Sequence, residues 1–132
     1  MKKTIPSTIL LFLLLTALVG NLVVAYASDI MPLYTGVASL TSGLTISTTG
    51  KATCSGKVML WDDYTADVTV ELKRDGTTIK TWTSSGTDVV SAGGTYYVTS
   101  GHEYVVTTTA TVYDSNGKIV ESPSKDSPSK NY

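Results

Sequence analysis

The sequence contains a single histidine, His102, as its candidate for a general base near neutral pH. Glu103 follows it directly, but adjacent residues on a strand point to opposite faces, so the two side chains do not form a natural acid–base pair. There is no Gly-x-Ser-x-Gly segment, and no Ser, His and Asp are placed in support of a catalytic triad. We therefore expect a structural histidine, no catalytic residue and no enzymatic activity.

Asp62, Asp63 and Asp67 form the one cluster of acidic residues in the sequence. A calcium site needs several oxygen ligands, commonly at alternating loop positions and with a glycine at the sharp turn. The three aspartates have neither feature. We expect a solvated loop between two strands there, with no metal site and no cofactor.

Cys54 is the only cysteine, so an intramolecular disulfide is excluded. It alternates with Ala52, Gly56 and Val58 along an expected strand, which places all four on one face. Free cysteine is among the most buried residue types. We predict a buried, inert thiol; the alternative is a reactive or pairing one.

Aromatic residues are the most suggestive candidates for binding. Flat rings on a sheet face stack on sugar rings or anchor a protein partner, because they bury a large area at low entropic cost. The alternative is that they fill the core. Strand alternation sends Tyr96 and Tyr97 to opposite faces, so some rings must look outward. The candidate ligand-contacting residues are Trp61, Tyr64, Trp82, Tyr97 and Tyr113.

Two segments establish the expected fold class. From Ala66 to Lys73, apolar and polar residues alternate strictly, which is typical of a half-buried strand, and Asp75-Gly76 then predicts a tight hairpin. Residues 103–113 form a second clear strand, ending at a turn over residues 114–117. Further strands are expected at residues 34–40, 44–47, 51–60, 78–84, 88–91, 95–99 and 118–122.

Short strands with turn signals between them, and no helical period after residue 28, predict an all-β sandwich or barrel. Removing the first 27 of 132 residues leaves 105, enough for one domain with one modest core. We place that domain at residues 28–122. The stretch from Pro123 to Tyr132 has two prolines and few apolar side chains, which predicts a flexible tail.

The N-terminal segment predicts export. Lys2 and Lys3 precede an almost wholly apolar run from Ile9 to Val24, and Ala25-Tyr26-Ala27 has the small-x-small pattern that signal peptidase cleaves. We predict a signal peptide at residues 1–27 and a secreted protein beginning at Ser28. The alternative is retention as an anchor, because roughly 20 apolar residues cross a bilayer. No apolar tail follows Val120, so no membrane anchor is expected after cleavage.

The balance of charge excludes one class of partner. The chain has 10 basic and 11 acidic residues, and loss of Lys2 and Lys3 leaves 8 against 11, a formal charge of −3. These charges are scattered and of both signs. Nucleic-acid binding requires a basic patch, so no nucleic-acid partner is expected.

The segment 99–117 resembles the late part of a fibronectin type III domain, where a Gly-x-x-Tyr-x-Val-x-x-x-Ala run leads to an Asn-Gly turn. The resemblance implies an immunoglobulin-like β-sandwich of about seven antiparallel strands. It also implies that Tyr104 forms a tyrosine corner, its hydroxyl bonding back to nearby backbone. Trp61 is the candidate for the early tryptophan of that family.

Most of residues 30–122 is also similar to a family of small secreted proteins of Gram-positive bacteria, a domain of unknown function. The similarity lies in residues 31–36, 50–56, 95–101 and 111–122. It implies a location and a fold, and no activity.

These observations predict a secreted, non-enzymatic binding or cell-envelope-associated module. Cell-wall carbohydrate and another extracellular protein are the candidate partners. The alternative is a bacteriocin-like effector that acts on other cells. A small hydrolase is the third hypothesis and the weakest, because no nucleophile–base pair is visible.

Overall fold

The computed structural model describes residues 34–132, so the signal segment expected at residues 1–27 lies outside the described part. That part contains strands and no helix, and hence no helix that could cross a bilayer. The strands are β1 (Val37–Ile46), β2 (Lys51–Leu60), β3 (Thr65–Arg74), β4 (Thr77–Thr87), β5 (Val89–Tyr97), β6 (Glu103–Tyr113), β7 (Ile119–Glu121), β8 (Ser124–Asp126) and β9 (Lys130–Asn131). The prediction of an all-β domain is confirmed.

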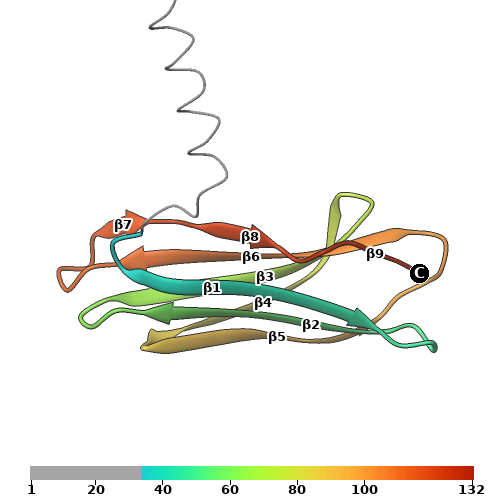
Figure 1. The fold of residues 1–132 in the computed structure, drawn as a ribbon, viewed down its shortest axis with the longest axis horizontal. Coiled ribbons are helices and arrows are strands. Elements are labelled where there is room, and N and C mark those ends of the chain that lie inside the picture. The colour runs from blue at the N-terminus through green and yellow to red at the C-terminus, as the bar shows by residue number, and fades with distance from the viewer. Residues whose placement is uncertain (1–33) are drawn as a thin grey trace, which may run out of the picture. The chain divides into compact units, whose positions relative to one another are not determined.

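The strands form two antiparallel sheets, layered over one another in Figure 1. The three-stranded sheet has the order β1-β2-β5. The six-stranded sheet has the order β4-β3-β6-β7, and β8 and β9 also pair with β6. Neighbouring strands of the described domain all pair antiparallel.

One apolar core joins the two sheets, because alternation gives β2, β3 and β6 one buried side each. On β3, Ala66, Val68, Val70 and Leu72 are all at most 1 % exposed, as their alternation predicts. The rest of the core comes from β1, β2, β5 and β6, and its residues are Val37, Leu40, Leu44, Ala52, Cys54, Val58, Leu60, Val90, Tyr104, Val106, Ala110 and Val112.

The hairpin between β3 and β4 follows from its two central residues. Arg74 and Thr77 are paired, so Asp75 and Gly76 alone form the loop. Their φ angles are +49° and +87°. A two-residue turn with both φ angles positive matches the right-handed twist of the flanking strands, and Asp-Gly is a preferred sequence for it.

Two expected breaks in the strands are absent. β1 runs through residues 41–43 and β5 runs through residues 92–94, which lie between the expected strands. Small residues are required here by close approach rather than by a turn, since a Cβ on Gly94 would contact the Trp82 ring. The strands expected at residues 34–40 and 44–47 are therefore one strand, as are those expected at 88–91 and 95–99.

The expected flexible tail is instead part of the six-stranded sheet. We call residues 123–132 the C-terminal strap. Its strands β8 and β9 pair with β6 (Figure 1). Ser127 is 6 % exposed, donates its N–H to Val106 O at 2.8 Å and accepts the Val106 N–H on its Oγ at 2.9 Å. The strap therefore completes the hydrogen bonding of the β6 edge.

The first and last described residues are held at opposite ends of the long strands. At one end the Glu121 carboxylate accepts the N–H groups of Thr35, Gly36 and Val37 at 2.8, 3.1 and 3.1 Å. At the other end the Tyr132 hydroxyl donates to Thr48 O at 3.1 Å, and the C-terminus lies there in Figure 1.

Candidate functional site

The outer side of the three-stranded sheet is the most distinctive surface of the domain. The register places one residue set from its three strands on that side, away from the core. We call it the three-stranded face; its residues are Ser39, Thr41, Gly43, Thr45, Lys51, Thr53, Ser55, Lys57, Met59, Val89, Ser91, Gly93, Thr95 and Tyr97. Most of these side chains are short and uncharged, so the surface is flat.

Two of the five candidate aromatics border this face. Tyr97 at the end of β5 is 69 % exposed, and Trp61 directly after β2 is 58 % exposed. Neither belongs to the core or to the residues packed against it. Met59 and Val89 are paired across the strands beside Trp61 and are 42 % and 51 % exposed, so this end of the face is apolar.

The other three candidates lie elsewhere. Tyr64 and Trp82 are partly buried and pack against the core, Tyr64 beside Gly36 and Trp82 beside Gly94. Tyr113 lies on the opposite sheet, where its hydroxyl donates to Asp67 at 2.9 Å. The structure therefore does not bring the five together, and only Trp61 and Tyr97 share a sheet surface.

The two sheet surfaces differ in charge. The charged residues of the three-stranded face are Lys51 and Lys57. The opposite surface carries Asp67, Glu71 and Asp126, each of which accepts a hydroxyl hydrogen bond. Among residues 34–132, the side chains close enough to form an ion pair are those of His102 and Asp75, so no carboxylate pairs with either lysine of the face.

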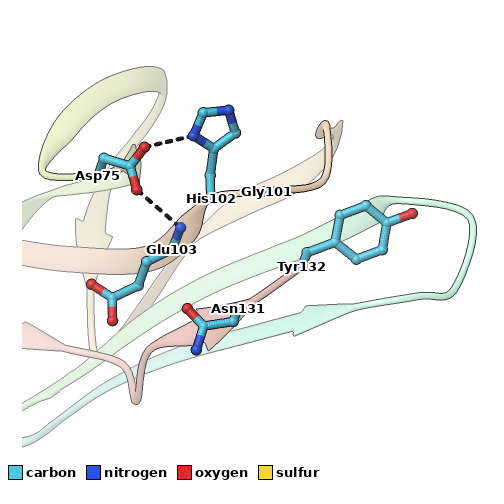
Figure 2. A pocket seen from close by; sticks show the side chains of 6 residues that line it. All are labelled: Asp75, Gly101, His102, Glu103, Asn131 and Tyr132. Atoms are coloured by element: carbon cyan, nitrogen blue, oxygen red, sulfur yellow. Dashed lines mark hydrogen bonds and ion pairs between the residues drawn. The ribbon is translucent and has the colours of Figure 1, made fainter.

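A second candidate is an open depression of about 360 Å³ beside the β3–β4 hairpin, lined by Asp75, Gly101, His102, Glu103, Asn131 and Tyr132 (Figure 2). His102 Nδ1 lies 2.6 Å from Asp75 Oδ2, and the Glu103 N–H donates to Asp75 Oδ1 at 3.0 Å. In Figure 2 the Tyr132 ring points away from this pair. The backbone N–H of Glu103, followed by the His102 ring, lowers the pKa of Asp75.

An Asp–His pair orients and stabilises an imidazole in hydrolases, but catalysis also needs a nucleophile within reach of the ring. The lining of this depression holds no Ser, Thr or Cys. The arrangement instead ties the β3–β4 hairpin to the start of β6. We assign the pair a structural role, as expected for His102. Glu103 takes part through its backbone N–H, and its carboxylate does not pair with His102.

Two further expectations concern Cys54 and the aspartates. Cys54 is 2 % exposed, and burial raises the pKa of its thiol to about 11, so little thiolate exists at neutral pH. The prediction of a buried thiol is confirmed.

Asp67 lies on β3 rather than in the loop with Asp62 and Asp63. Residues 34–132 contain no group of three His, Cys, Asp or Glu side chains placed to hold a metal ion.

Sequence reasoning missed Lys51 and Lys57 as candidates. Both follow the polar alternation of β2, and Lys51 is the cross-strand partner of Tyr97. The alternation was visible in the sequence, but the β2–β5 register was not.

No protein-family model matches the chain, and no curated protein matches it either.

Proposed function

We propose that this protein is an extracellular, non-enzymatic binding module that engages its ligand through the three-stranded face. The observation that carries the proposal is the exposure of Trp61 and Tyr97 at the two ends of one flat sheet surface. Large exposed aromatics on a rigid sheet lose little conformational entropy on binding and bury a large area. Secretion, predicted from residues 1–27, would give this surface access to cell-envelope components.

We further propose an immunoglobulin-like sandwich of the fibronectin type. The Tyr104 ring is fully buried, and its hydroxyl donates to Thr99 O at 2.5 Å in the loop before β6. This bond is the one expected of a tyrosine corner and supports the proposed type. Loops at the ends of a rigid sandwich and its sheet faces are the usual binding surfaces of such domains.

The distribution of ionisable groups favours binding over catalysis. The thiol is buried, and the one Asp–His pair has no nucleophile in its depression. Asp67 is engaged by the hydroxyls of Ser85 and Tyr113, which lower the pKa of its carboxyl. The Asp67 and Asp75 carboxylates therefore order neighbouring side chains. Because their pKa values are lowered, they are not poised to exchange protons near neutral pH.

The test is retention of the purified protein by isolated bacterial cell envelopes. We expect the parent to bind and the variants Trp61→Ala and Tyr97→Ala to lose most of that binding while keeping the parent's circular dichroism. Tyr113→Ala is the matched control, because it removes an aromatic ring from the opposite sheet; it should bind like the parent.

Binding that survives loss of both Trp61 and Tyr97 would contradict the proposed site. Growth inhibition of other bacteria by the purified protein, without envelope binding, would instead favour the secreted effector.

A further inference from the structure

We propose that the three-stranded face binds an anionic polysaccharide, with Tyr97 as the stacking platform and Lys51 and Lys57 as the opposing charges. The inference rests on the proposed binding function and specifies its ligand. It begins at Tyr97, which at 69 % exposure is the most exposed large hydrophobic residue among residues 34–132.

Tyr97 and Lys51 form a composite contact. They are direct cross-strand partners on β5 and β2, so they stand side by side on the same face. Cβ atoms of such partners are about 4.5–5.5 Å apart. One sugar ring could therefore stack on the phenol while its acidic substituent reaches the ammonium group. An aromatic ring alone would select sugars; the adjacent lysine adds a preference for negative charge.

The surface beyond this contact is open along β2. The next cross-strand pair is Thr53 and Thr95, followed by Ser55 and Gly93, and then Lys57 and Ser91. These short side chains offer hydroxyl groups and form no ridge across the sheet. Lys51 and Lys57 are six residues apart, which corresponds to about 20 Å along a strand. Two charges at that separation fit an extended polymer better than a single sugar.

Charge sets both the sign of the ligand and its position. The three-stranded face carries two lysines and no carboxylate. Asp62 and Asp88 lie beyond the other end of the strands, next to Trp61 and Val89. The anionic groups of a bound chain are therefore attracted to the region between Tyr97 and Lys57. Two widely spaced lysines are too few for nucleic acid, which requires a dense basic patch.

Polygalacturonate, a carboxylated polysaccharide, is the probe, and its methyl ester is the neutral control. We expect the purified protein to bind polygalacturonate in calorimetry, more weakly at high salt because exposed charges are screened beyond about 10 Å at 0.1 M. Lys51→Gln with Lys57→Gln should weaken binding by about tenfold, because both positive charges of the face are lost. Tyr97→Ala should weaken it similarly.

The matched control is Lys80→Gln with Lys125→Gln, which removes two exposed lysines from the other sheet and should bind like the parent. Thermal unfolding of every variant separates lost binding from lost folding. No binding to polygalacturonate, equal binding of its methyl ester, or equal binding of single-stranded DNA would overturn the inference. If envelope binding still depends on Trp61 and Tyr97 in that event, the proposed function stands and only the anionic ligand is wrong.

Discussion

Tyr104 shows how one side chain contributes to both packing and hydrogen bonding. It is the largest fully buried side chain of the described domain. Its ring joins the core beside β3, where Arg74 is its cross-strand partner, while its hydroxyl satisfies the Thr99 carbonyl. The two contributions can be separated, because phenylalanine keeps the ring and loses only the hydroxyl.

We predict that Tyr104→Phe folds with a modest loss of stability, because a typical hydrogen bond contributes about 0.5–1.5 kcal/mol. Tyr104→Ala also removes the ring, and an aromatic-to-alanine change in a core costs about 3–5 kcal/mol. That is a large part of the about 5–15 kcal/mol available to a domain. Urea unfolding of both variants measures the difference.

The control for this pair must come from the opposite side of β6. Thr107, which simple alternation would suggest, is unsuitable because it is 7 % exposed and donates to Asp126 at 2.7 Å. Thr111 has a partly exposed side chain, so Thr111→Ala should unfold close to the parent. A Tyr104→Ala protein as stable as the parent would show that this ring does not support the core.

At the scale of elements, alternation predicts strands that have one apolar side. β2, β3 and β6 were each located within one or two residues because their buried and exposed residues alternate. β8 and β9 have no such pattern, since their residues are all exposed and their attachment uses the backbone and Ser127. The composition of residues 123–132 therefore suggested a flexible tail, whereas pairing with β6 orders this segment.

The candidate site was predictable only in part, for a related reason. Trp61 and Tyr97 were identified as outward candidates, but so were Tyr64 and Trp82. The difference between the two pairs comes from tertiary packing. Gly36 and Gly94 leave room for the Tyr64 and Trp82 rings to lie against the domain. That close approach requires knowledge of which strands become neighbours, which alternation within one strand cannot supply.

We predict that deleting the C-terminal strap destabilises the domain and promotes association. The deletion removes the strand pairing of β8 and β9 with β6. It also removes the bonds Ala110 N to Pro123 O, Ser127 N to Val106 O, Val106 N to Ser127 Oγ and Thr107 Oγ1 to Asp126 Oδ1. At about 1 kcal/mol each, their loss is a substantial fraction of the stability. It also exposes the unpaired edge of β6, which is a template for pairing with other chains.

Urea unfolding and light scattering measure the two effects. Ser129→Ala, which alters an exposed strap residue and keeps every bond to β6, is the control. A truncated protein with the parent's unfolding midpoint would show that the strap contributes nothing to the sheet.

At the scale of the whole molecule, the two sheet surfaces are chemically different. One carries two lysines and border aromatics; the other carries carboxylates bonded to hydroxyl groups. A domain with this asymmetry has a preferred orientation toward a charged surface. The proposed polysaccharide would meet the three-stranded face and leave the acidic side in solvent.

We predict that the exported protein begins at Ser28, on the grounds of Ala25-Tyr26-Ala27 alone, since these residues lie outside the described part. The intact mass of protein from the culture medium should match residues 28–132. Protein of full-length mass confined to the membrane fraction would instead establish a retained anchor.

The placement of the two chain ends has a mechanical consequence. Near the start of the described chain, Gly36 is bound to the Glu121 carboxylate, and at its end Tyr132 is bound to Thr48. These two places lie at opposite ends of the long strands. A pull applied between these ends acts along β1 and β6 rather than across them. The β1–β2 ladder, paired from Val37 to Ile46, would be loaded in shear, so many hydrogen bonds would have to yield together instead of opening one by one.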